Sequence, residues 1–236
     1  MPDTYRSTSV PGLPGLAAYM DAISAGFCPY LGPSLDRATT WNSVYTLDCT
    51  TIEEVEQMLF YLGVLHTEIL RRSWKDAALS NRPFICENLF LRFLGEDDCD
   101  GGALFSWPHW ILKTHYTQTG ILFGKFWKGE EAQSRDDRPV PPPPYHMLSI
   151  RRTVKPRDPH FFLKAPELLP ELADSVDDGR CVWPEVTNAA FLAAIANPAT
   201  TGDEMIAQAR SLMATGVYEG LVREAREKIQ AQRPTH

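Results

Sequence analysis

A long run of helical periodicity in the first third of the chain sets the strongest limit on the fold. Thr50 and Thr51 precede Glu53 and Glu54 by three residues, which is the pattern of a capping box at a helix start. The apolar residues that follow recur at helical spacing: Ile52, Val55, Met58, Leu59, Leu62, Leu65, Ile69 and Leu70. A helix with one apolar face must pack against a second layer. We expect it to end at Asn81-Arg82-Pro83.

Four segments rich in β-branched, aromatic or alternating apolar residues are expected to be strands. They span residues 43–49, 84–94, 121–127 and 145–154. Helices are expected at 16–25, 107–119, 166–175, 187–196, 201–215 and 217–232. The order β-α-β-α-β-β predicts an α+β fold, with a mixed four-stranded sheet packed against helices and a helical C-terminal extension.

The remaining segments define the expected organisation of the chain. Residues 1–15 are rich in Pro, Gly, Ser and Thr and are expected to be flexible; 16–165 form the α+β core domain; 166–236 form a helical region that packs on the core. This helical region is a candidate lid or homo-oligomer contact. Within the core, we expect a compact turn at 27–33, a solvated acidic loop at 95–102 and a proline-rich loop at 128–144.

Charge and composition argue against several classes of partner. Thirty acidic residues against 23 basic ones give a net charge of −7, and no basic stripe for nucleic acid is present. No segment approaches the roughly 20 apolar residues that cross a bilayer. The N-terminal residues lack the basic-then-apolar order of a secretory signal, so we expect a cytoplasmic protein. The five cysteines are scattered, which favours reduced thiols over disulfides or a zinc site.

Common catalytic motifs are absent from the sequence. There is no H-E-x-x-H, G-x-S-x-G, P-loop or G-x-G-x-x-G. His109 and His115 lie six residues apart on the helix predicted at 107–119, so they point to different faces and do not jointly hold one metal. A zinc hydrolase and a nucleotide-binding enzyme are therefore not supported.

A haem site needs fewer residues, because one axial ligand, an apolar slot and a few cations can suffice. His109 lies between Trp107 and Trp110, an aromatic setting that could suit haem. A half-buried histidine with a purely structural role is the more common outcome for such a residue. Cys28 and His115 are alternative ligands, and each is more often structural.

Charged residues on the predicted strands are candidates for contacts with an anion or for catalysis. Arg151 and Arg152 point to opposite faces of their strand, so one of them can face inward. An inward arginine needs an anionic partner: a propionate, a substrate carboxylate or a structural acid. Glu87 and Arg92 on the strand predicted at 84–94 are similar cases.

Several short motifs together resemble a bacterial family of unknown function that is distantly similar to the YqcI/YcgG-type proteins. In chain order they are Phe27-Cys28-Pro29-Tyr30, His109-Trp110-Ile111-Leu112-Lys113, Gly120-Ile121-Leu122-Phe123-Gly124-Lys125-Phe126, Met147-Leu148-Ser149-Ile150-Arg151 and Asp158-Pro159-His160-Phe161-Phe162-Leu163. They cover residues 27–163. The glycine-containing motif departs from the expected pattern, which has Leu-Met after the first glycine and a Phe-His ending.

The YqcI/YcgG-type group includes haem-dependent N-hydroxylases of natural-product pathways. The resemblance implies a haem pocket between sheet and helices and oxidation at the nitrogen of a small metabolite. His109 is then the expected axial ligand, with Lys113 and Arg151 as anion partners and Trp107 and Trp110 as further cofactor contacts. Arg151 and Glu87 are the predicted catalytic residues.

Two other functions stay open from the sequence. One is a non-catalytic binding or interaction domain, in which the proline-rich loop and the helical tail contact a protein partner. The other is a cofactorless or flavin-dependent enzyme that uses the same pocket.

Overall fold

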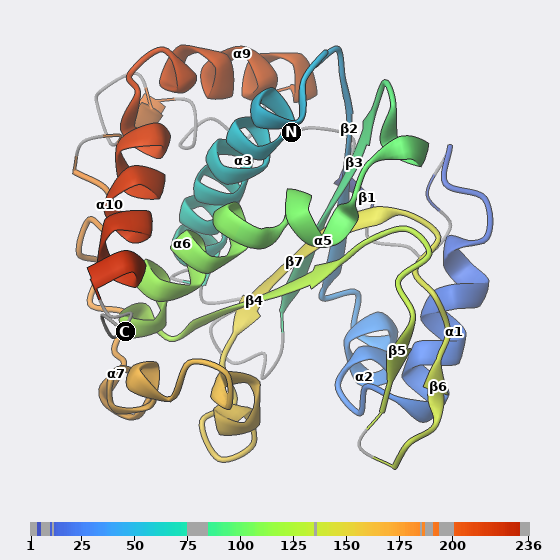
Figure 1. The fold of residues 1–236 in the computed structure, drawn as a ribbon. Coiled ribbons are helices and arrows are strands. Elements are labelled where there is room, and N and C mark those ends of the chain that lie inside the picture. The colour runs from blue at the N-terminus through green and yellow to red at the C-terminus, as the bar shows by residue number, and fades with distance from the viewer. Residues whose placement is uncertain are drawn as a thin grey trace.

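The chain folds around a mixed five-stranded sheet with helices on both faces (Figure 1). The computed structural model describes residues 4–5, 10, 12–74, 85–134, 136–184, 186, 191–193 and 201–231. The strands of this sheet are β1 (Thr4–Tyr5), β2 (Thr40–Leu47), β3 (Cys86–Phe93), β4 (Ile121–Phe126) and β7 (His146–Arg152). Their order is β1-β2-β3-β7-β4, with β2 and β3 parallel and the other neighbours antiparallel.

The predicted α+β class and the mixed sheet are confirmed. The four predicted strands correspond to β2, β3, β4 and β7, and β1 adds a short fifth strand. The described helices are α1 (Leu16–Gly26), α2 (Leu31–Asp36), α3 (Ile52–Ser73), α5 (Gly101–Leu104), α6 (Ser106–Tyr116), α7 (Leu169–Asp174), α9 (Gly202–Met213) and α10 (Val217–Ala231). Short 3-10 turns are η1 (Glu96–Asp98), η2 (Thr117–Thr119), η3 (Asp158–Phe162) and η4 (Pro166–Leu168).

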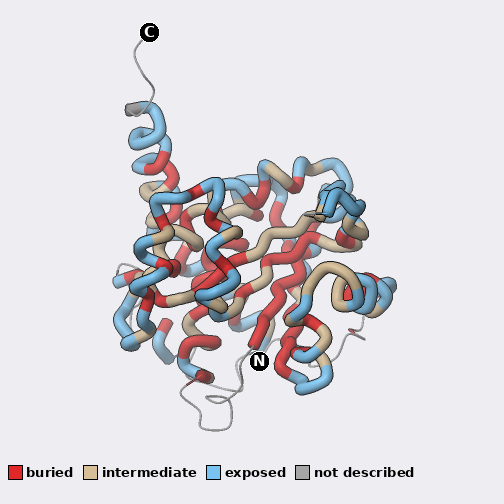
Figure 2. Tube along the Cα trace, turned by 90° about the horizontal axis from the view of Figure 1, so that it is seen from below, coloured by how far each residue is buried: buried red, intermediate tan, exposed pale blue. Residues whose placement is uncertain are grey.

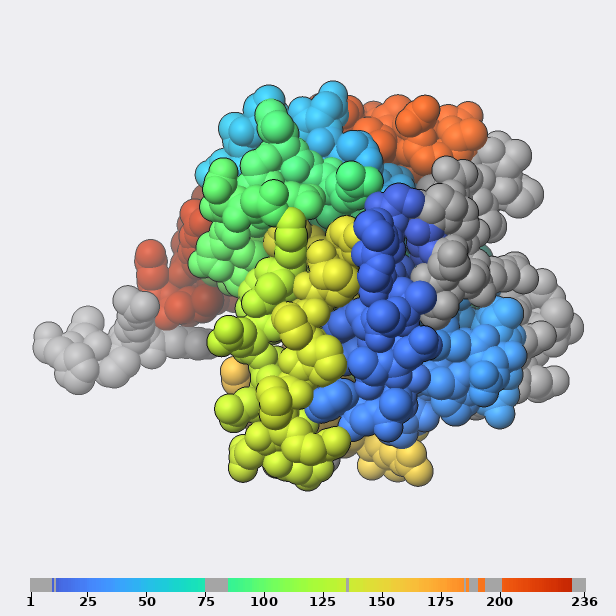
Figure 3. Space-filling model, turned by 90° about the vertical axis from the view of Figure 1, so that its right-hand side faces the viewer, coloured from blue at the N-terminus to red at the C-terminus, as the bar shows by residue number. Residues whose placement is uncertain are grey.

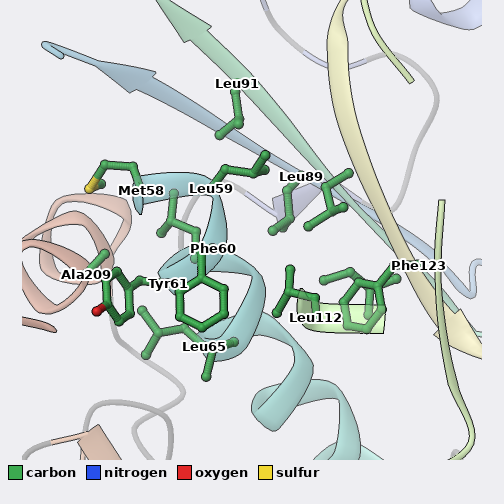
Figure 4. Close-up of a cluster of buried hydrophobic side chains, with 14 of the residues drawn as sticks. Met58, Leu59, Phe60, Tyr61, Leu65, Leu89, Leu91, Leu112, Phe123 and Ala209 are labelled. Atoms are coloured by element: carbon green, nitrogen blue, oxygen red, sulfur yellow. The ribbon is translucent and has the colours of Figure 1, made fainter. Parts of the chain in front are cut away.

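Helix α3 begins where the capping box predicted. The Thr51 side chain accepts a hydrogen bond from the Glu54 amide, and the Glu54 side chain accepts one from the Thr51 amide. The helix ends at Ser73, with Trp74 as its C-cap, so the end predicted at Asn81-Arg82-Pro83 was too late; residues 75–84 lie outside the described residues. The apolar face of α3 packs on β3 and α6 in the main core (Figure 4). The core residues labelled in Figure 4 come from α3 and from the elements packed against it: Met58, Leu59, Phe60, Tyr61, Leu65, Leu89, Leu91, Leu112, Phe123 and Ala209.

Strand alternation divides the sheet into two faces with separate cores. One face packs against α3 and α6, and α9 joins it through Met205, Ala209 and Leu212. On the other face, Phe90 and Met147 pack against residues of α1. Leu122 on the same face packs against η3, η4 and α7. The buried residues therefore follow the central strands (Figure 2). Because both faces of these strands are covered, we expect a functional site at the sheet edges or between the layers.

Three segments differ from the sequence prediction. The turn expected at 27–33 gives way to α2 at Leu31, because Pro33 is compatible with a first helical turn. The acidic loop expected at 95–102 contains η1 and the start of α5. The proline-rich loop at 128–144 contains a hairpin of β5 (Ala132–Gln133) and β6 (Pro139–Val140). Arg138 beside this hairpin donates to the Gly26 carbonyl, which holds the loop against α1 (Figure 3).

The other predicted elements agree closely with the structure. The first core strand starts three residues earlier than expected, and the helix expected at 107–119 divides into α6 and η2 before Gly120. The helix expected at 187–196 lies largely outside the described residues. Helix α9 starts at the beginning of the segment expected at 201–215, where Thr201 and Glu204 form a capping box. Among the described helices, none has both the length and the apolar character that crossing a bilayer requires.

Candidate functional site

His109 lies where helix α6 crosses the edge strand β4. Pro108, Ile111, Leu112 and Tyr116 form the buried face of α6, and His109 follows the first of them. Its Nε2 atom lies 3.1 Å from the Phe123 carbonyl oxygen of β4. A carbonyl oxygen only accepts, so Nε2 carries the proton and the ring lone pair is on Nδ1.

The imidazole of His109 is held in its neutral form. The pKa of His109 is lowered to about 4, chiefly by burial and also by the positive charges of Lys125 and Lys113, while the bond to Phe123 opposes this shift. Neutral imidazole is the form that binds a transition metal or accepts a proton. His109 is therefore a competent ligand or base at neutral pH.

Two lysines lie within electrostatic reach of His109. Lys113, one helical turn along α6, donates to the Phe161 carbonyl at 2.8 Å and lies 4.3 Å from the centre of the Phe162 ring. Lys125 extends from β4 with its Nζ atom 5.7 Å from the centre of the Trp127 ring. Burial lowers the pKa of both lysines, opposed by the acidic groups nearest to them.

Neither lysine has a carboxylate within ion-pair distance in the described part of the chain. Half-buried ammonium groups without a paired acid favour the approach of an anion. We name His109, Lys113 and Lys125 the α6–β4 site. Lys125 was not among the sequence candidates. The alternation of Ile121, Phe123 and Lys125 along β4 is the signal that could have identified it.

Arg151 belongs to a neighbouring cluster on the opposite face of the sheet. Its guanidinium donates to both carboxylate oxygens of Asp158, at 2.7 and 3.0 Å, and Asp158 is fully buried. The anionic partner that the sequence analysis required for an inward arginine is therefore a structural acid, Asp158. The Arg151 guanidinium also lies 5.6 Å from the centre of the Phe161 ring. The backbone carbonyl of Phe161 accepts the hydrogen bond from Lys113. Segment η3 thus connects the Arg151–Asp158 pair to the α6–β4 site.

Glu87 lies apart from these residues, under helix α3. Its Oε1 atom contacts His66 Nδ1 and accepts from the Ser43 hydroxyl, and the Tyr45 hydroxyl lies 2.5 Å from His66 Nε2. A proton on Nδ1 satisfies the ring, which then donates to Glu87 and accepts from Tyr45. All four of these residues are buried, with at most 3% of their surface exposed. This arrangement joins α3 to β2 and β3, and among the described residues no hydrogen bond or ion pair links Glu87 to His109.

His66, like Ser43 and Tyr45, was not among the sequence candidates, although its position carries a signal. It lies on the apolar stripe of α3, four residues after Leu62 and four before Leu70. A polar residue at such a position needs a buried partner, which is the signal that could have identified it. Burial, followed by the charge of Glu87, raises the pKa of Tyr45 well above its ordinary value.

The tryptophans and alternative ligands have contacts of other kinds. Trp107 and Trp110 meet edge to face with ring centres 6.4 Å apart, and the Arg226 guanidinium of α10 lies 5.3 Å from Trp107. His115 stacks on Trp183 with ring centres 4.3 Å apart. Cys28 is a free, partly buried thiol. None of these contacts involves the His109 ring.

Among the described residues, no group of three or more His, Cys, Asp or Glu side chains is arranged to hold a metal ion. A single histidine ligand to haem does not require such a group. Comparison with family models, with curated proteins and with solved structures finds no match. The resemblance to YqcI/YcgG-type proteins therefore stays a prediction.

Proposed function

We propose that this chain is a haem-dependent oxidase or N-oxygenase of a small nitrogen-containing metabolite, with His109 as the axial ligand. The observation that supports this is a neutral imidazole beside two half-buried lysines that lack an ion-pair partner among the described residues. Iron binds neutral imidazole, and haem propionates need cations. The α6–β4 site supplies both in one place.

Each residue of the site has a defined role in this proposal. The bond from His109 to the Phe123 carbonyl fixes the ring orientation and the tautomer, as second contacts do at metal-bound histidines. His109 would hold the haem iron through a ring nitrogen, which is Nδ1 if the bond from Nε2 to Phe123 is kept. Lys113 and Lys125 hold the anionic groups. Bound haem supplies the oxidising chemistry at the substrate nitrogen.

Arg151 has a supporting role in the same proposal. Asp158 fixes its guanidinium, and its contact with Phe161 places it beside the segment that Lys113 binds. It orients η3 and adds positive charge for an anionic cofactor or substrate. Glu87 has no such connection, so the proposal assigns it to the contact between α3 and the sheet.

The absorption spectrum during hemin titration tests the proposal. We expect saturable binding with a Soret band that shifts on reduction, and loss of this band in His109→Ala. Combined Lys113→Met and Lys125→Met should weaken binding about tenfold, since two exposed-to-half-buried ion pairs contribute about 1.4 kcal/mol together. His115→Ala, on the same helix but stacked on Trp183, is the matched control. A flat titration in the parent protein contradicts the proposal.

One observation favours a second candidate function, a non-catalytic binding domain for an anionic ligand. His109 and Lys113 each already bond a backbone carbonyl, so the site is satisfied without a metal. In this case the protein stays colourless with hemin and both lysines still contribute to anion binding. The proposed cytoplasmic location accompanies either candidate, and the five free cysteines agree with a reducing compartment. The small molecule is a substrate in the first candidate and a ligand in the second.

A further inference from the structure

Positive charge is concentrated in one short part of this acidic chain. Residues 151–164 contain five basic residues and one acidic residue, a net charge of +4 in a chain of net charge −7. The segment includes η3, and in Figure 1 it is the yellow-gold stretch before α7. Such an asymmetry creates a local positive potential that attracts an acidic partner.

Part of this charge is used inside the protein, and part faces solvent. Asp158 pairs with Arg151, and Lys155 donates to the carbonyls of Ala173 and Ser175. Arg157 and Lys164 are exposed.

In the described ranges of the chain, Arg157 and Lys164 form no ion pair within 4.0 Å. The Arg157 guanidinium lies 5.8 Å from the Tyr30 ring. Asp158, the acidic neighbour of Arg157 in sequence, pairs with Arg151, and Glu167, the acidic residue nearest to Lys164 along the chain, acts through its charge on Lys113. Two exposed cations therefore flank the surface of η3.

Large apolar side chains are exposed between these cations. Phe161 is 50% exposed and Leu163 is 76% exposed. The backbone of this segment is held in place, because Lys113 binds the Phe161 carbonyl. His160 and Arg151 lie against the Phe161 ring, with the ring centres of His160 and Phe161 3.9 Å apart. Adjacent exposed apolar groups rimmed by charge mark an interaction surface.

We propose that the surface formed by Arg157, Phe161, Leu163 and Lys164 binds an acidic segment of a partner protein that carries an apolar residue. The positive charges of Arg157 and Lys164 call for acidic residues in the partner segment. The exposed side chains of Phe161 and Leu163 call for an apolar residue between them. A short segment matches the size of the surface, which offers two apolar side chains. An anionic bilayer is disfavoured, because the rest of the chain carries a net charge of −11. This inference does not depend on haem binding.

Fluorescence anisotropy with a labelled peptide of glutamate and interspersed leucine tests the proposal. Reversal of both charges in Arg157→Glu with Lys164→Glu should weaken binding about tenfold, and added salt should weaken it in the parent protein. Phe161→Ser with Leu163→Ser should weaken binding several-fold through the lost apolar contact. Arg210→Glu in α9, at the far end of the molecule in Figure 1, is the control and should leave binding unchanged.

Three results would overturn the proposal. The first is equal peptide binding by the parent protein and the doubly reversed variant. The second is binding to phosphatidylserine vesicles with none to the peptide, which assigns the surface to lipid. The third is self-association that the charge reversal abolishes, which assigns it to a second copy of the chain. Circular dichroism establishes that each variant is folded before the comparison.

Discussion

Replacement of His109 by glutamine should remove a specific part of the acid sensitivity of this protein. Glutamine keeps an amide that can donate to the Phe123 carbonyl, but it does not titrate. The pKa of His109 falls from 6.5 to about 4 on folding, chiefly through burial. Between these values the unfolded chain binds a proton that the folded chain does not. The parent protein should therefore lose stability as the pH falls through this window.

The expected size follows from the pKa difference. A shift from 6.5 to about 4 corresponds to about 3 kcal/mol of unfolding free energy, since each pKa unit contributes about 1.4 kcal/mol. Urea unfolding at neutral pH and at pH values down to 4 measures it, with the parent protein and His109→Gln compared at each pH. The difference in unfolding free energy between them should change by about this amount in favour of the variant at low pH.

His115→Gln is the control for the loss of an imidazole from the same helix. The His115→Gln variant still contains His109, so its unfolding free energy should fall with pH as that of the parent protein does. Parallel pH profiles for the parent protein and His109→Gln would refute the reasoning, because they would show that His109 titrates in the folded protein as it does in the unfolded chain.

Two further substitutions test the packing of the core. Tyr45→Phe leaves His66 Nε2 as a buried acceptor without a donor and should cost about 2 kcal/mol, a fall in Tm of roughly 4–8 °C. An unchanged Tm would show that this contact contributes nothing. Gly101→Ala places a methyl group 2.5 Å from Trp127 Cγ and should cost about 3 kcal/mol by calorimetry. At Gly32 an added methyl group lies 3.8 Å from Ser24 Cβ, an ordinary contact, so Gly32→Ala is the control; an equal effect at both glycines would contradict the steric argument.

Much of the fold could be predicted because local and global signals agree. The capping boxes at Thr51 and Thr201 fixed two helix starts, and helical spacing identified the face of α3 that packs on the sheet. Strand limits were less accurate, because sheet pairing extends β2 back to Thr40 through its partner β3. The hairpin of β5 and β6 was not predicted, because proline lacks the N–H of a strand ladder and a proline-rich segment is therefore expected to be a loop.

The site could be predicted only in part. His109 and Lys113 lie four residues apart in sequence, so their proximity follows from helix geometry. The pairing of Arg151 with Asp158 depends on the path of the chain between them, which no residue pattern specifies. Glu87 was predicted to be catalytic, but the structure pairs it with His66 on another element, and a link between distant elements requires the folded structure.

Chemical rescue of the axial position tests the central claim most directly. The His109→Ala protein is mixed with hemin, and its absorption spectrum is recorded before and after free imidazole is added. If His109 is the ligand, the variant lacks the parent Soret band and imidazole restores it, while Lys113→Met keeps the band without imidazole. If His109→Ala binds hemin with the parent spectrum, or imidazole restores nothing, His109 does not hold the cofactor.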